Sequence, residues 1–181
     1  MRKFFAMMMA LAMLFSFAAC GSKTAEPTTA PTEAAAKVEG TMEELLNKVV
    51  EINPVEFMGG TVPIDLTDTS EDGLWNIKYN TGLDSAEGLT DAAMFGPMMG
   101  SMAFSLVMVR TAEGTDVKAI AEGMKNGIDP RKWSCVEADD LQVVSYGDVV
   151  MLIMVDSTSG LTSQSFVDAF AQVCGGSVTT Y

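Results

Sequence analysis

The sequence predicts a single α+β domain in which helices pack on one face of a small antiparallel sheet of three to four strands. Apolar residues at helical spacing alternate along the chain with short runs rich in β-branched and apolar residues. Turn signals that contain glycine separate neighbouring runs, as in antiparallel hairpins. The predicted folded region, residues 41–174, is long enough to bury a core of its own.

The first predicted helix follows Thr41, because Glu44 three residues later completes a capping box. Its apolar side chains recur at helical spacing: Met42, Leu45, Leu46, Val49 and Val50. Pro54 cannot continue a helix, so we expect this helix to end before it. Over 59–88 the pattern predicts only a short helix at 74–79.

Two strand pairs are predicted. The apolar run 103–109 indicates a central strand, which we expect to pair with 89–95 across a glycine-bounded turn. The runs 141–145 and 149–155 flank the turn pair Gly147-Asp148 and predict a tight hairpin.

Two further helices complete the predicted fold. One begins after Gly114-Thr115-Asp116, and we expect Asn126-Gly127 to end it in a left-handed conformation. The last begins after Thr162 and Ser163 and ends at Gly175-Gly176.

Charge and composition exclude several classes of function. The chain of 181 residues has 24 acidic and 11 basic residues, no His, and a formal charge of −13. Such a surface repels nucleic acid, so no nucleic-acid partner is expected. Without His there is no Ser-His-Asp triad, no His-ligated zinc and no imidazole base.

The N-terminus predicts export and lipid attachment. Residues 1–19 combine basic Arg2 and Lys3 with a short apolar run, as in a signal peptide. The sequence Phe17-Ala18-Ala19-Cys20-Gly21 resembles the lipobox of bacterial lipoproteins, in which Cys20 becomes the lipidated first residue. Two acyl chains on Cys20 are enough for stable membrane anchoring. The alternative is an ordinary secretory signal in which Cys20 is incidental.

The rest of the chain then divides into three parts. Residues 20–40 begin with the lipidated Cys and continue as a flexible Ala/Thr/Pro/Glu tether, which has too few large apolar residues to fold. Residues 41–174 form the α+β domain, and 175–181 a C-terminal tail. We expect the protein at the outer face of the cytoplasmic membrane.

Three stretches carry a resemblance to a known family. They are Ile128-Asp129-Pro130-Arg131-Lys132-Trp133-Ser134-Cys135-Val136-Glu137-Ala138, Pro97-Met98-Met99 before the strand 103–110, and Tyr146-Gly147-Asp148 before 149–155. They resemble small lipoproteins of Gram-positive bacteria that carry domain of unknown function 4358. The resemblance spans 43–174 and implies a lipid-anchored, extracytoplasmic α+β domain, but it implies no activity.

Two patterns point to metals. Asp68, Ser70 and Asp72, followed by Gly73, match the start of a calcium loop, but Tyr79 stands where calcium needs a bidentate Glu. An acidic turn that caps the next helix is therefore favoured over calcium binding.

The second pattern is a methionine cluster. Thioethers bind Cu(I), and the cluster consists of Met94, Met98, Met99 and Met102. Its apolar neighbours favour core packing or an adaptable contact surface instead. We therefore expect no metal and no cofactor.

The segment 129–133 is the leading candidate for binding a partner. Asp129, Arg131, Lys132 and Trp133 join a rigid bend, two cations and a large aromatic side chain in an otherwise acidic chain. The alternative is a loop in which Trp133 closes the edge of the core and the charges are solvated.

Cys135 and Cys174 are the thiols that remain after lipidation of Cys20. They either form one disulfide, which an extracytoplasmic site permits, or stay as two free thiols. Asp139 and Asp140 are adjacent in a strand and point to opposite faces, so they are not expected to act together on a substrate.

These observations favour a membrane-anchored, non-catalytic binding or interaction module of the cell envelope, with no catalytic residues. The partner would be an envelope protein or a small ligand. The first alternative is an envelope protein that binds calcium, copper or a small ligand. The second is a hydrolase that uses carboxylates alone.

Overall fold

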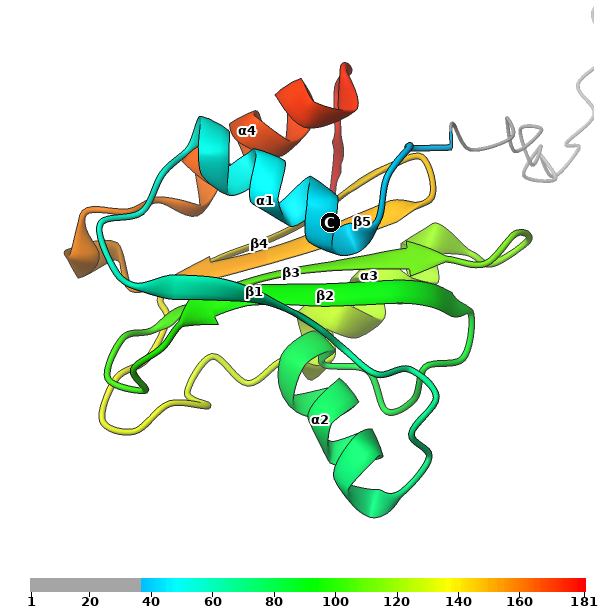
Figure 1. Ribbon diagram of the computed structural model, residues 1–181, viewed down its shortest axis with the longest axis horizontal. Helices are drawn as coiled ribbons and strands as arrows, with labels where there is room; N and C mark the ends of the chain where they lie inside the picture. Colours follow the sequence, from blue (N-terminus) through cyan, green and yellow to red (C-terminus); the bar gives the residue numbers. More distant parts are fainter. Residues whose placement is uncertain (1–36) are drawn as a thin grey trace, which may run out of the picture. The chain divides into compact units, whose positions relative to one another are not determined.

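The computed structural model describes residues 37–181, which form one α+β domain (Figure 1). The predicted signal peptide, Cys20 and most of the predicted tether lie outside the described residues. Along the chain the elements are α1 (Met42–Ile52), β1 (Gly59–Pro63), α2 (Glu71–Thr81), β2 (Leu89–Pro97), β3 (Phe104–Thr111), α3 (Val117–Gly127), β4 (Asp140–Tyr146), β5 (Val149–Val155), the 3₁₀ turn η1 (Ser157–Ser159), α4 (Ser163–Cys174) and β6 (Thr179–Thr180).

The α+β class is confirmed, but the sheet is larger than predicted. It has six strands in the order β1-β2-β3-β5-β4-β6, and every neighbouring pair is antiparallel. Both predicted hairpins, β2–β3 and β4–β5, are present. The additional strands lie at the edges. β1 has the sequence Gly-Gly-Thr-Val-Pro, which lacks a strand pattern, and β6 has two residues within the expected C-terminal tail.

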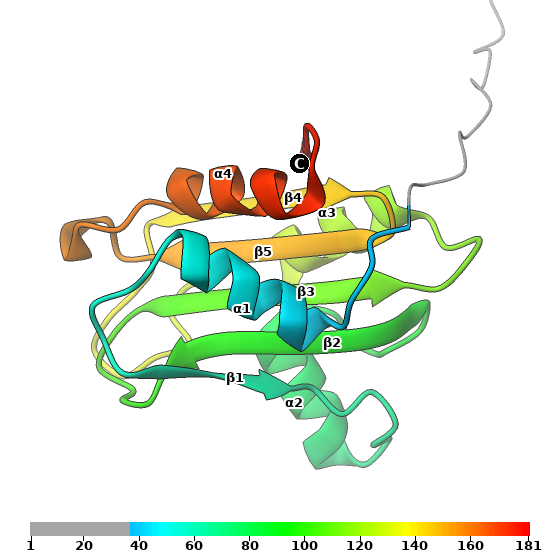
Figure 2. The same cartoon turned by 45° about the horizontal axis from the view of Figure 1, so that its top comes forward.

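Helices cover both faces of the sheet, so the prediction of one covered face is wrong (Figure 2). Helices α1 and α4 pack on one face and α2 and α3 on the other. The reason is visible in β5, where every residue from Val149 to Val155 is buried. Its alternate side chains enter two separate cores, Met151 on one face and Leu152 on the other.

Local capping explains where the helices begin and end. The Thr41–Glu44 capping box of α1 is confirmed. Helix α2 is longer than the predicted 74–79, because the Ser70 side chain accepts a hydrogen bond from the Gly73 N–H and Gly82 ends the helix at φ +82°. Asp116 caps α3 as predicted.

The predicted left-handed stop at Gly127 is wrong. Gly127 is the last residue of α3, and Ile128, which follows it as the C-cap, is in an extended conformation with φ −70°. Glycine is needed there because α3 passes the end of α2 at backbone contact: a Cβ on Gly127 would lie 2.0 Å from the carbonyl oxygen of Gly82.

The two ends of the sheet differ in what they carry. At one end the chain arrives from residue 37, and the Val38 N–H donates to Asp148 Oδ1 at 3.1 Å, beside the β4–β5 turn. At the other end lie the β2–β3 connection and the segment that joins α3 to β4 (Figure 1). The sequence-predicted segment 129–133 is part of this second end.

Candidate functional site

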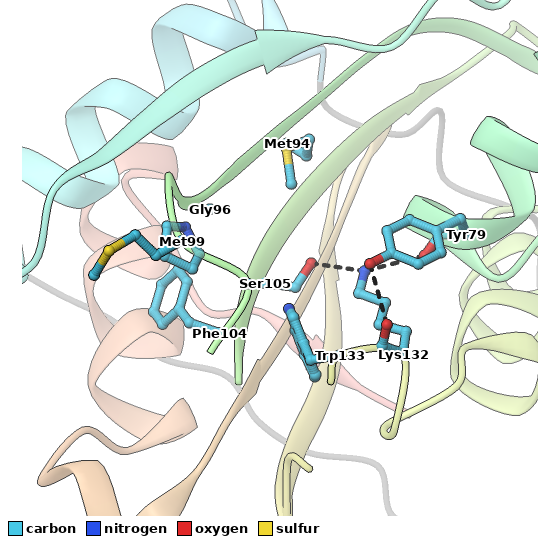
Figure 3. A pocket seen from close by; sticks show the side chains of 10 residues that line it. Tyr79, Met94, Gly96, Met99, Phe104, Ser105, Lys132 and Trp133 are labelled. Atoms are coloured by element: carbon cyan, nitrogen blue, oxygen red, sulfur yellow. Dashed lines mark hydrogen bonds between the residues drawn. The ribbon is translucent and has the colours of Figure 1, made fainter. Parts of the chain in front are cut away.

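A cavity of about 160 Å³ lies at the second end of the sheet, where β2 ends and β3 begins. Elements from three parts of the chain meet there: α2, the β2–β3 pair and the segment after α3 (Figure 3). The residues that give it its chemistry are Tyr79, Met94, Met99, Ser105, Lys132 and Trp133. We call it the Lys132 cavity.

The ammonium group of Lys132 lies between aromatic rings. Its Nζ donates to the carbonyl oxygen of Tyr79 at 3.0 Å and to Ser105 Oγ at 3.2 Å. The same atom lies 4.7 Å from the centre of the Tyr79 ring and 5.4 Å from that of Trp133. Both distances are in the range of a cation–π contact, so the two rings replace part of the lost hydration.

Burial changes the protonation of this lysine. Desolvation lowers the pKa of Lys132 from 10.5 to about 8, and the nearby carboxylate of Asp129 opposes part of that shift. Within residues 37–181, Lys132 has no ion-pair partner within 4.0 Å, although the chain is strongly acidic. The cavity therefore holds a cation without a counter-ion.

Local hydrogen bonds hold the segment that carries Lys132. Asp129 Oδ1 accepts the Arg131 N–H at 2.9 Å, which shapes the bend at Pro130. The Pro130 carbonyl accepts the Ala138 N–H at 2.8 Å, and the Tyr79 hydroxyl donates to the Lys132 carbonyl at 3.3 Å. The segment is thus held by hydrogen bonds between its own residues and by hydrogen bonding to Tyr79 on α2.

Exposed apolar side chains lie at or next to residues that line the cavity. Met98 and Met99, in the β2–β3 connection, are 72% and 71% exposed, and Trp75 on α2 is 63% exposed. Trp75 stacks on Tyr79 with ring centres 4.8 Å apart, which extends the aromatic surface from the cavity along α2. We call Trp75, Met98 and Met99 the apolar rim. Exposed apolar side chains near a cavity are typical of a contact surface.

The structure divides the predicted recognition segment. Lys132 and Trp133 line the cavity, and Trp133 also packs against the core on the α2–α3 face. Asp129 and Arg131 are exposed on the bend outside it. Trp133 therefore closes the edge of the core, as the alternative interpretation has it, and also lines the cavity, while partner binding by this segment stays a prediction.

The methionine cluster is not gathered around one point. Met102 packs against the core beneath α1 and α4, whereas Met94 packs against the core on the opposite face. Met98 and Met99 are exposed. Packing and surface contact are therefore the roles that the structure supports for these four residues.

The acidic turn before α2 is used for capping. Ser70 Oγ accepts the Gly73 N–H at 3.1 Å, and Asp68 Oδ1 accepts the Ser70 N–H at 2.9 Å. Asp72 lies in the first turn of α2, where its negative charge interacts favourably with the helix dipole. In the described part of the chain, no three acidic or Cys side chains are placed to hold a metal ion.

Cys135 and Cys174 are free. Cys174 packs against the core beneath α1 and α4, whereas Cys135 is exposed in the segment after α3, next to residues that pack on the opposite face. Burial, with a smaller contribution from Asp148, raises the pKa of the Cys174 thiol to about 11, so it is unreactive at neutral pH.

Asp139 and Asp140 accept hydrogen bonds from two different serines. Asp139 accepts hydrogen bonds from the N–H and hydroxyl of Ser157, at 2.7 and 2.6 Å. Asp140 accepts from the N–H and hydroxyl of Ser163, at 2.7 and 2.5 Å. Each carboxylate therefore fixes a separate turn after β5, and the two do not converge.

Three residues of the site were not predicted from the sequence: Trp75, Tyr79 and Ser105. The spacing of four residues between Trp75 and Tyr79 places both on one side of α2, and this was an available signal. No sequence signal pointed to Ser105, because a single Ser within an apolar strand does not indicate that its side chain lines a cavity.

Within residues 37–181, the helices are all too short or too polar to cross a membrane. Comparisons with protein-family models, with curated proteins and with solved structures give no match. The resemblance to lipoproteins with domain of unknown function 4358 therefore stays a prediction from the sequence.

Proposed function

We propose that the protein is a lipid-anchored, extracytoplasmic binding module without catalytic activity, and that the Lys132 cavity with its apolar rim is its recognition site. The observation that carries this proposal is the lysine in the cavity. A partly buried cation with no ion-pair partner costs stability, and such a cost is typical of a functional site.

The position of the cavity suits an anchored module. The lipobox-like sequence at Cys20 supports attachment at the N-terminal side. The chain enters the domain at Val38, which lies at the opposite end of the sheet from the cavity. A tether that joins the domain there leaves the cavity on the side away from the attachment point.

The alternatives gain unequal support. Small-ligand binding is favoured by the cavity itself. Metal binding has no three-residue acidic or Cys cluster to support it in the described residues. A carboxylate-based hydrolase needs two acids at one site, and the lining of the Lys132 cavity contains neither Asp nor Glu.

Two measurements on the full chain test the two halves of the proposal. In a bacterium that processes lipoproteins, we expect wild-type protein to incorporate labelled fatty acid and to fractionate with membranes. Cys20→Ser is expected to do neither. Labelling that persists in Cys20→Ser would contradict the anchor.

The recognition site is tested by thermal unfolding of the full chain in detergent micelles, against small acids, amines, neutral solutes and short peptides. A ligand at a hundredfold excess over its dissociation constant adds about 2.7 kcal/mol to the stability. At least one class should raise the midpoint for wild type and not for Trp133→Ala. If no class raises it, the cavity is not a recognition site.

A further inference from the structure

We propose that the Lys132 cavity binds a carboxylate group carried on a small apolar body; this rests on the proposal that the cavity is the recognition site. The inference comes from three features of the lining: its unused hydrogen-bond donors, its lack of anions, and its apolar walls.

Three donors around the cavity have a hydrogen without an acceptor. A protonated lysine has three N–H hydrogens, and Lys132 uses two of them, on Tyr79 and Ser105. Ser105 is 1% exposed; its oxygen accepts from Lys132, and its own hydroxyl hydrogen has no acceptor in residues 37–181. Trp133 lines the cavity as well. Its indole N–H can only donate, and it makes no hydrogen bond within residues 37–181.

These donors belong to one site. Lys132, Ser105 and Trp133 all line the same cavity, and the indole nitrogen lies at the end of the Trp133 ring that is drawn nearest Ser105 (Figure 3). A carboxylate has only acceptor positions, about four of them on two oxygens. It can therefore accept from all three donors, whereas an amide would bring its own N–H groups against them.

The electrostatics favour an anion over a neutral acceptor. The lining holds one cation and no Asp or Glu, in a chain with a charge of −13. The other titratable groups that face Lys132 are the phenol of Tyr79 and the carboxylate of Asp129. The two aromatic rings do not form a free cage for a cationic ligand, because Lys132 already occupies their faces.

The remaining walls are apolar and the space is small. Met94, Pro97 and Met99 supply apolar side chains to the lining of the cavity. Its volume of about 160 Å³ is close to that of a protein cavity that holds benzene, roughly 150 Å³. The body of the ligand is therefore a branched aliphatic chain or a single ring. A free acid of this size or the last residue of a peptide would supply the same chemistry.

The proposal carries an expected pH dependence. Because the pKa of unliganded Lys132 is about 8, the ammonium is present at neutral pH and is lost above it. Binding of a carboxylate should therefore weaken as the pH rises through 8, and the bound anion should raise the pKa of Lys132 in turn.

Thermal unfolding of the full chain in detergent micelles tests the inference with matched probes. These are isovalerate, its amide isovaleramide, isoamylamine, and inorganic phosphate; the peptide source is represented by N-acetyl-glycyl-leucine and its C-terminal amide. We expect isovalerate or the peptide acid to raise the midpoint by several degrees, and its uncharged or cationic analogue to have no effect. Whichever acid is the more effective identifies the source.

The variants assign the effect to the cavity. Lys132→Met keeps a side chain of similar length without the charge and should weaken binding of the acid at least tenfold. Ser105→Ala removes one donor, keeps the lysine and should weaken binding several-fold. Lys48→Met, which removes an exposed cation on α1, is the matched control and should bind as wild type does.

The outcomes separate the two proposals. If an amide or the amine is as effective as the acid, the carboxylate inference is wrong and the cavity stays a recognition site. Stabilisation by phosphate alone would likewise overturn the carboxylate. If Lys48→Met loses binding as much as Lys132→Met does, general charge attraction and not the cavity explains the effect. If no probe of any class acts, both proposals fail.

Discussion

At the residue scale, the distinctive feature of this protein is a lysine that the fold partly desolvates. The sequence singled out Lys132 and Trp133, which line the cavity, because two cations and an aromatic residue stand out in an acidic sequence. Their partners Tyr79 and Ser105 were not, because they come from α2 and β3 and reach Lys132 only through tertiary packing.

The cost of burying Lys132 predicts a pH-dependent stability. Its pKa is about 8 in the folded chain and 10.5 ordinarily. Between these values the unfolded chain binds more protons than the folded one, so the contribution of Lys132 to stability rises with pH. Below pH 8 the lysine is charged in the folded chain, and the full cost of burying its charge lowers the stability. In urea unfolding, wild type should gain stability relative to Lys132→Met between pH 8 and 10.5. Parallel curves for the two proteins would contradict this.

Asp139 predicts a second pH dependence, in the acidic range, in which stability also rises with pH. Hydrogen bonds from the Ser157 side chain, and then from its backbone N–H, lower the pKa of Asp139 below 3.8. The stability that these bonds provide is present above 3.8 and is lost as the pH falls through the folded-state pKa. Asp139→Asn should therefore lose less stability than wild type between pH 6 and pH 3. Glu56→Gln, at an exposed position, is the control and should behave as wild type.

At the element scale, local chemistry predicted both hairpins and the starts of α1, α3 and α4, but not the length of α2 or the end of α3. Capping residues mark the starts of α1 and α3, and the turn glycine Gly147, at φ +57°, fits the β4–β5 hairpin. The edge strands β1 and β6 were not predictable, because they form through pairing with β2 and β4 and not through their own sequence pattern. The second covered face was signalled by the unbroken apolar run of β5.

The junction between α2 and α3 gives a test of backbone packing. Gly82 and Gly160 both have φ +82°, but they differ in the space around them. A Cβ on Gly82 would lie 2.5 Å from the backbone nitrogen of Ile128, whereas a Cβ on Gly160 would meet nothing within 4 Å. Gly160→Ala should cost about 1 kcal/mol, from the left-handed conformation alone. Gly82→Ala should cost about 2 kcal/mol more, because the helices must separate.

Equal costs for Gly82→Ala and Gly160→Ala, measured by urea unfolding, would show that the α2–α3 contact has room for a methyl group. That result would contradict the close approach of the two helices and would also question the placement of Tyr79, which α2 carries into the Lys132 cavity.

At the scale of the whole molecule, the sheet separates the end where the chain arrives from the end that carries the cavity. Arg110 and Asp148 fix the arriving segment: they form an ion pair at 2.5 Å with side chains 12% and 18% exposed. Arg110 Nη2 also donates to the Gly40 carbonyl at 2.7 Å, and Asp148 accepts the Val38 N–H. Removing one partner of such a partly buried ion pair lowers the stability strongly, because the other charge is left without a partner.

Arg110→Met should therefore lower the free energy of unfolding by about 3 kcal/mol and should expose the backbone near Gly40 to protease in the folded state. Because the Lys132 cavity lies at the other end, the affinity for isovalerate should change little. A large loss of affinity in Arg110→Met would show that the two ends are coupled, contrary to the division described here.

The most direct test of the recognition site uses the two tryptophans of the chain as reporters. In a two-dimensional ¹H–¹⁵N NMR spectrum of the full chain in micelles, each indole N–H gives one signal. On titration with isovalerate, the Trp133 signal should move downfield, because its N–H donates to the carboxylate, and the Trp75 signal should move little. Neither should move with isovaleramide. Titration without any shift at Trp133, or with equal shifts at both, would contradict carboxylate binding in the Lys132 cavity.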